Sequence, residues 1–184
     1  GDTLADPIQL FFSGHIYPKG AQVAHQLRRL LGDSLFWAGM QRFLTVNAYK
    51  PVRTENFAVA FEQVANRDLD WFFDQWVYGI GYPKVTVTRH WDATARQLHV
   101  TVSQTQTIDA THPLFCFPVT IRMITADSVV RREIMVSKQT ETFTLPVSQE
   151  PLSFRFDEGA WLLGTVTTDQ TPAELAAMAR HDLE

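Results

Sequence analysis

The spacing of apolar residues changes near residue 82 of this chain. Before this point they recur every three or four residues, which is the period of an amphipathic helix. After it they alternate with polar residues, which is the period of a strand with one buried face. We therefore predict a two-part α+β chain: a helical part, then an antiparallel β-sandwich, then a short C-terminal helix.

Breakers and caps divide the helical part. Residues 1–16 are predicted to be an irregular lead-in, because Pro7 and Gly14 interrupt them. Pro18 suits a first helical turn, because the N–H that proline lacks would have no partner within the helix there. Gly32 and Gly79 are good helix ends. Four helices are predicted, and they begin near Pro18, Asp33, Thr54 and Asp68.

The second part has six or seven short strands separated by turn signals, which is typical of an antiparallel sandwich. The clearest lie near residues 85–88, 98–103, 119–123, 129–136, 141–146 and 152–157. Thr171-Pro172-Ala173-Glu174 then begins a last helix, so short that we expect it to have little to pack on. The predicted domains are residues 1–82, 83–168 and 169–184.

Composition excludes several classes of protein. The 184 residues are 45% hydrophobic with a net charge of −4, which fits a globular chain and argues against nucleic acid as a partner. No apolar run approaches the roughly 20 residues that span a bilayer, so no membrane span is expected. The first residues lack a basic and apolar leader, so no signal peptide is expected. The compartment stays open.

The chemistry-bearing residues do not form a self-contained metal site. No two of the six histidines are four residues apart, and there is no H-E-x-x-H. His90 and His99 are possible cross-strand neighbours, but a pair is a weak basis for a site. We therefore predict no metal-binding and no cofactor-binding residues. Cys116, alone between two phenylalanines, is expected to pack as a small hydrophobe.

Other polar and aromatic clusters have simple structural interpretations. The acid pairs Asp68/Asp70 and Asp157/Glu158 are expected at a helix cap and a turn. The cluster of Trp71, Phe72, Phe73 and Trp76 has helical spacing and is expected in the core. Tyr17 stands before the first helix. Its pattern alone leaves open whether it packs against the helix or carries chemistry.

Five short motifs follow one another between Ile16 and Val87. They are Tyr17-Pro18-Lys19-Gly20-Ala21, Leu27-Arg28 with Leu31-Gly32-Asp33-Ser34-Leu35-Phe36, Thr54-Glu55-Asn56-Phe57, the stretch from Asp68 to Trp76, and Gly81-Tyr82-Pro83. In this order they resemble the aminopeptidase N family of zinc metallopeptidases, the gluzincin aminopeptidases related to leukotriene hydrolase. Fainter matches are Gln104 at a strand end and Trp161-Leu162-Leu163-Gly164 at the exit of the sandwich.

The resemblance implies a fold and an activity. The chain would hold the α-helical C-terminal half of a gluzincin catalytic domain, a β-sandwich, and the start of a C-terminal helical, HEAT-like region. The parent would use zinc to remove N-terminal residues from peptides. The H-E-x-x-H half is absent, so this fragment would lack the zinc ligands and be inactive alone. Its partners would be the missing catalytic half, the C-terminal helical region and, in the parent, a peptide substrate.

Only one catalytic residue carries over from the resemblance. Tyr17 would donate a hydrogen bond to the oxyanion of the tetrahedral intermediate. Lys19 is interpreted as a helix-start charge and Gly20 as a small residue that allows close packing. One alternative is a non-catalytic scaffold or interaction module. Another is a stand-alone sandwich that binds carbohydrate or protein through Trp91.

Overall fold

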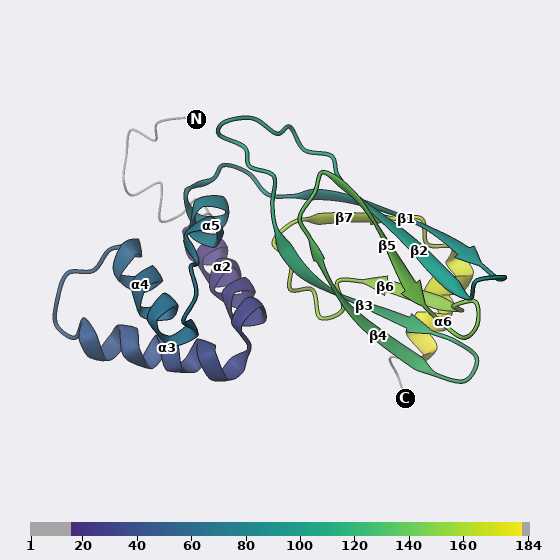
Figure 1. Cartoon of the computed structure of the whole chain (residues 1–184), viewed down its shortest axis with the longest axis horizontal. Helices are drawn as coiled ribbons and strands as arrows, with labels where there is room; N and C mark the ends of the chain where they lie inside the picture. Colours follow the sequence, from purple (N-terminus) through teal and green to yellow (C-terminus); the bar gives the residue numbers. More distant parts are fainter. Residues whose placement is uncertain (1–15, 182–184) are drawn as a thin grey trace. The chain divides into compact units, whose positions relative to one another are not determined.

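A computed structural model of the chain describes residues 16–181. These residues form two compact units that divide between Gly79 and Ile80. The first unit is helical, and the second is made of strands with one helix (Figure 1). The α+β fold with a sandwich and a C-terminal helix is confirmed. Residues 1–15 of the predicted lead-in, His15 among them, lie outside the described residues, and Ile16 belongs to the first described helix.

The described part of the helical unit, residues 16–79, contains four α-helices, and the last of them continues into a π-helical turn. They are α2 (Ile16–Leu31), α3 (Asp33–Val46), α4 (Thr54–Ala65), α5 (Asp70–Phe73) and η1 (Asp74–Tyr78). All four predicted starts lie within two residues of a helix start. The fourth predicted helix is the continuous α5–η1 segment, and Gly79 follows it as predicted.

Gly32 makes the sharp turn between α2 and α3. Its φ of 78° lies in the left-handed region, which glycine adopts without a Cβ clash. Its N–H donates to Arg28 O at 2.8 Å, which completes the last turn of α2. The Arg28 guanidinium then makes two bonds to the Asp33 carboxylate, at 2.7 and 2.8 Å, across the same turn.

An aromatic cluster forms the core of the helical unit. Phe61 of α4 is fully buried, and its ring lies 4.6 Å from that of Phe57 and 5.6 Å from that of Phe36, between centroids. Gly39 lets α3 approach this ring closely, because a Cβ there would lie 2.5 Å from Phe61 Cδ1. The predicted core position of Phe72, Phe73 and Trp76 is confirmed, since all three are buried, while Trp71 is half-buried.

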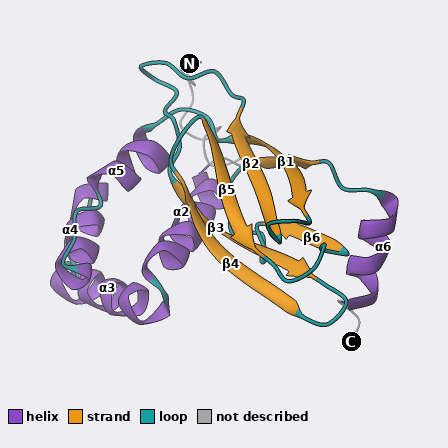
Figure 2. Ribbon diagram, turned by 45° about the vertical axis from the view of Figure 1, so that its right-hand side comes forward, coloured by secondary structure: helices purple, strands orange, loops and turns teal. Residues whose placement is uncertain are grey.

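The second unit is a sandwich of two sheets (Figure 2). Its strands are β1 (Lys84–Asp92), β2 (Gln97–Gln104), β3 (Phe117–Ile124), β4 (Val129–Val136), β5 (Thr140–Pro146), β6 (Ser153–Phe156) and β7 (Thr165–Thr168). One sheet has the order β5-β2-β1-β7 and the other β4-β3-β6. Alternate residues of β2 point into the core, as the sequence pattern predicts. The first half of β3 alternates in the same way, but its last four residues are all buried, Arg122 included.

The last strand pairs differently from the others. β7 runs parallel to β1, with Lys84 opposite Thr165 and Val87 opposite Thr168, whereas the other pairs are antiparallel. Gly164 precedes it, and a Cβ there would lie 2.7 Å from the carbonyl oxygen of Pro83. The close approach of these two segments therefore requires glycine.

Gln104 ends β2 inside the core. Its side chain is buried, its amide donates to Phe115 O at 2.7 Å, and its oxygen accepts from Phe115 N at 3.1 Å. These two bonds satisfy a buried amide and hold both ends of the loop between β2 and β3 together. The sequence interpretation placed Gln104 at a strand end, and the structure agrees.

The C-terminal helix α6 (Pro172–His181) lies beside β6 of the sandwich (Figure 1). Our expectation that it has little to pack on is wrong. Glu174 of α6 pairs with Arg89 of β1, and Met178 accepts a hydrogen bond from the Gln170 side chain at 3.3 Å. No helix within residues 16–181 is both long enough and apolar enough to cross a membrane.

Candidate functional site

Tyr17 lies in the first turn of α2. Its side chain is 67% exposed, so it does not serve as a core residue of the described helical unit. Residues three, seven and ten positions further along a helix share its face, which places Gly20, Ala24 and Leu27 in line with Tyr17. All three of these residues line one cavity.

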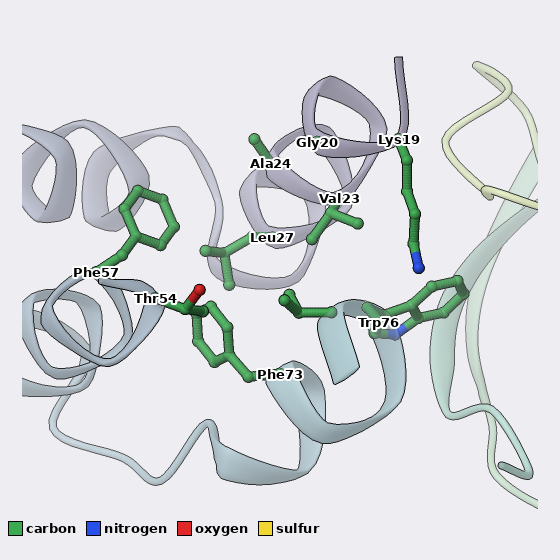
Figure 3. A pocket seen from close by; sticks show the side chains of 10 residues that line it. Lys19, Gly20, Val23, Ala24, Leu27, Thr54, Phe57, Phe73 and Trp76 are labelled. Atoms are coloured by element: carbon green, nitrogen blue, oxygen red, sulfur yellow. The ribbon is translucent and has the colours of Figure 1, made fainter. Parts of the chain in front are cut away.

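This cavity has a volume of about 490 Å³ and lies wholly within the helical unit. Its walls come from α2, α4 and the α5–η1 segment, and its lining is mostly apolar. The lining residues are Lys19, Gly20, Val23, Ala24, Leu27, Thr54, Phe57, Phe73, Trp76 and Val77. Figure 3 shows Val23 and Leu27 facing the helices opposite α2, with Lys19 extending toward the Trp76 indole.

Gly20 does not have the role predicted for it. A Cβ built at this position meets no described atom within 4 Å, so no close packing in this part of the chain requires glycine here. Instead, its missing side chain leaves the cavity wall open. Lys19 is half-buried at the rim, where its aliphatic stem can cover apolar surface while the ammonium stays in water.

The carboxylates of Glu62, Asp68 and Asp70 form the group of three metal-ligating side chains found among residues 16–181, with oxygens within 4.8 Å of one another. Hydrogen bonds to nearby backbone N–H groups account for the positions of two of these carboxylates without a metal. Glu62 accepts the Leu69 N–H at 2.9 Å, and Asp68 accepts the Asp70 N–H at 2.7 Å. The Asp68 and Glu62 charges raise the pKa of the Asp70 carboxyl. A set of oxygens alone does not fit zinc, which takes mainly histidine and cysteine in proteins.

His90 and His99 are direct cross-strand partners, as the sequence suggested. Their rings are nearly parallel, with centroids 6.4 Å apart. His99 also lies 3.2 Å from Thr144 Oγ1 on β5. The pair belongs to the outer face of the sandwich, on strands that do not line the cavity of the helical unit.

Another cavity, of about 360 Å³, lies in the sandwich unit, and His112 and Lys84 are among its lining residues. Asp109 positions this histidine: its carboxylate accepts the His112 N–H and contacts Nδ1 of the ring, both at 2.9 Å. It also accepts the Thr111 N–H at 2.8 Å. These bonds hold the pKa of the Asp109 carboxyl far below its usual value. The sequence analysis missed this cluster, and a single aspartate three residues before a histidine is too common to reveal it.

The remaining candidates have structural roles. Asp157 sits in a turn with φ of 59° and accepts the Leu162 N–H at 3.0 Å, while Glu158 pairs with Arg131 at 2.7 Å. Cys116 is half-buried, and this burial raises the pKa of its thiol. Trp91 is also half-buried, opposite Leu98 of β2.

Comparison with known proteins places the helical unit in a class of peptidases. Residues 3–76 match the model of the peptidase family M1 domain. The aminopeptidase N of Haemophilus influenzae is 34% identical over 94 residues, which cover 51% of this chain and 11% of that protein. Aminopeptidase 2 of Candida albicans is 21% identical over 180 residues, or 98% of this chain and 19% of that protein.

A solved structure extends the fold likeness into the sandwich. Aminopeptidase A of Legionella pneumophila, in complex with aspartic acid, matches 91% of this chain and 19% of its own with a TM-score of 0.77, at 15% sequence identity. The helical unit and the sandwich thus have the fold of an aminopeptidase. The match of residues 3–76 and the aminopeptidase N relatives support membership in the aminopeptidase N family of peptidases. It spans roughly a tenth to a fifth of the length of these relatives.

Proposed function

We propose that this chain is part of a zinc-dependent aminopeptidase, which hydrolyses N-terminal residues from peptides, and that Tyr17 is its oxyanion-stabilising residue. The match of residues 3–76 to a peptidase family carries the proposal, because Tyr17 opens α2 within that match. The Tyr17 side chain is 67% exposed at this helix start, so it can be reached from solvent.

The chemistry assigned to Tyr17 needs only a neutral hydroxyl. Attack on a peptide carbonyl moves negative charge onto its oxygen, and a fixed O–H donor stabilises that charge in the transition state. A phenol donates one such hydrogen bond. The first turn of α2 fixes the tyrosine backbone, which limits the positions that the hydroxyl can reach.

Zinc in such an enzyme polarises the carbonyl and activates the attacking water. The H-E-x-x-H ligands that the family resemblance implies do not occur in this sequence, and the carboxylate group around Asp70 does not fit the ion. This chain is therefore proposed to supply the tyrosine but not the metal site, and to be inactive alone.

The apolar surface of the helical unit supports an incomplete catalytic domain. Besides the cavity lining, Trp37, Leu44 and Val59 are about half exposed or more on α3 and α4. Exposed apolar side chains that lie together commonly mark an interface with other protein. We propose residues 1–82 as the helical part of the catalytic domain, 83–168 as the sandwich domain and 169–184 as the start of a helical region.

The test is Tyr17→Phe in the longer protein that carries the zinc motif, assayed on an aminoacyl anilide. We expect kcat to fall by about 10²–10³-fold, the usual effect of losing one oxyanion donor. The matched control is Tyr49→Phe, which removes a hydroxyl from a fully exposed side chain and should leave kcat unchanged. An unchanged kcat for the Tyr17 variant would instead support a scaffold without catalysis.

The proposal also predicts the behaviour of this chain alone. It should neither hydrolyse the anilide nor bind zinc at one equivalent, measured by metal analysis after dialysis. One tightly bound zinc per chain would contradict it, because the metal would then need ligands that the proposal places elsewhere.

A further inference from the structure

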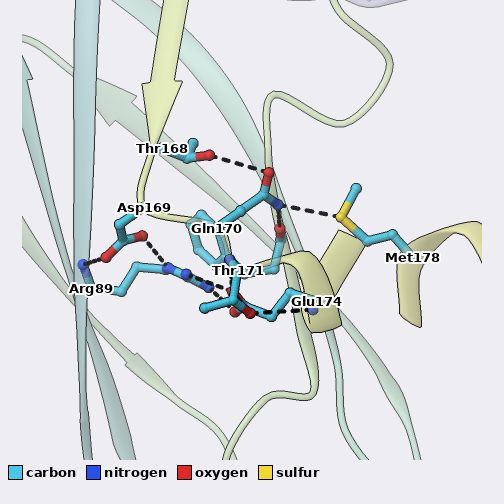
Figure 4. A network of polar contacts seen from close by, with 8 residues as sticks. Arg89, Thr168, Asp169, Gln170, Thr171, Glu174 and Met178 are labelled. Atoms are coloured by element: carbon cyan, nitrogen blue, oxygen red, sulfur yellow. Dashed lines mark hydrogen bonds and ion pairs between the residues drawn. The ribbon is translucent and has the colours of Figure 1, made fainter. Parts of the chain in front are cut away.

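Arg89 of β1 is the centre of a charged cluster that joins the sandwich to α6 (Figure 4). Its Nε donates to Asp169 Oδ1 at 2.8 Å, and its two terminal nitrogens donate to the Glu174 carboxylate at 2.6 and 3.2 Å. The Arg89 side chain is only 12% exposed, and its guanidinium lies 4.8 Å above the Phe154 ring. A planar guanidinium bound at both edges by carboxylates is among the stronger polar contacts in proteins.

Glu174 takes part in two structures at once. Besides pairing with Arg89, its Oε2 accepts the Thr171 N–H at 2.7 Å, and its own N–H donates to Thr171 Oγ1 at 3.3 Å. These reciprocal bonds form a capping box at the first turn of α6. The side chain that starts the helix is therefore also the side chain that holds it to β1.

The helix is too short to be stable without such contacts. It has ten residues, and helices below roughly 12–15 residues are marginal in water unless they pack on a partner. Two polar contacts hold the described side chains of α6 to the sandwich. One is the Arg89–Glu174 pair, and the other is Gln170, whose side-chain amide donates to Phe154 O and to Met178 Sδ. Ala173, Ala176 and Ala179 are exposed.

We propose that Arg89 is an ionic latch: its contacts with Asp169 and Glu174 hold α6 folded on the sandwich, and α6 detaches and unfolds as one segment when they are lost. The latch controls the direction in which the chain leaves the sandwich after β7. It acts within the sandwich unit and is independent of the peptidase reaction.

Hydrogen exchange of the whole chain tests the latch. In Arg89→Met, which keeps an apolar stem but no charge, exchange of the α6 amides should accelerate by about ten- to one-hundred-fold, since bonds to charged groups are lost. Amides of β2 and β3 should keep their wild-type rates. Raising NaCl from low to molar concentration should accelerate α6 exchange in the wild type but have little further effect in the variant.

Two further variants make the outcome decisive. Glu174→Gln removes the charge from α6 without touching β1, so it should loosen α6 even if Arg89→Met disturbs the strand. Arg132→Met, an exposed arginine of β4, is the matched control and should change nothing in α6. Wild-type α6 protection in both Arg89→Met and Glu174→Gln would overturn the proposal and assign the docking of α6 to Met178 and Gln170.

Discussion

At the scale of single residues, two helical glycines have opposite surroundings. Gly39 faces the buried Phe61 ring, whereas Gly20 faces open space in the cavity wall. Gly39→Ala should therefore destabilise the helical unit by about 1–3 kcal/mol, because its Cβ overpacks the core. Gly20→Ala should stabilise it by about 0.5–1 kcal/mol, because alanine is the better helix former. Urea unfolding followed by helix circular dichroism measures both, and equal effects would contradict the packing described.

Asp109 gives a pH prediction. Its folded pKa is lowered by its hydrogen bonds to Thr111 and His112. A lowered folded pKa means that the carboxylate contributes stability above its unfolded pKa, and this contribution is lost only as pH falls through the folded value. The amide shifts of Thr111 and His112 in an NMR titration should thus stay constant through pH 4. The Asp109→Asn chain is the reference that lacks this carboxyl but keeps His112, and a midpoint near pH 4 that is present in the wild type and absent from this reference would refute the prediction.

The residues of the candidate site could be predicted from the sequence only in part. Tyr17 was proposed because a lysine, a glycine and an alanine follow it in the family order, and its exposure could not be deduced from that order. The role of Gly20 was misjudged because a small residue in a helix signals close packing or open space equally well. The Arg89 cluster was missed because its partners lie 80 and 85 residues away along the chain.

At the scale of elements, periodicity was sufficient for the helices and the long strands, because their apolar faces are regular. It was insufficient for β7, whose four residues are mainly threonine and whose pairing with β1 spans the whole sandwich. The π-helical turn η1 was also not predicted. Phe72 and Trp76 are four residues apart, and this spacing places both on one face in an α-helical or a π-helical turn, so the apolar pattern does not distinguish the two.

The docking of β7 depends on Gly164. Gly164→Ala should push this segment away from the Pro83 carbonyl and weaken the β1–β7 pairing. We expect faster hydrogen exchange in residues 165–168 and a loss of about 1–3 kcal/mol in the sandwich unit. Val166→Ala, which shortens a partly exposed side chain on the same strand, should leave the pairing intact. If Gly164→Ala exchanges like the wild type, the close approach does not need glycine.

At the scale of the whole molecule, the division at Gly79 predicts two unfolding transitions. Gly39→Ala should lower only the helical transition. Gln104→Ala should lower only the sandwich transition, by about 1–3 kcal/mol, because the backbone groups of Phe115 lose their buried partner. Circular dichroism at 222 nm and hydrogen exchange of the strands separate the two. A single transition that both variants shift equally would show that the units unfold together.

The parallel pairing of β1 with β7 also has a mechanical consequence. Because these are the first and last strands of the sandwich, a pull on the two ends of the unit slides them past each other along their length. Their hydrogen bonds then share the load at once, whereas bonds at the end of a peeled hairpin break one at a time. Once α6 has been pulled off, the sandwich is therefore expected to resist stretching through its termini more strongly than an antiparallel terminal pair of the same length.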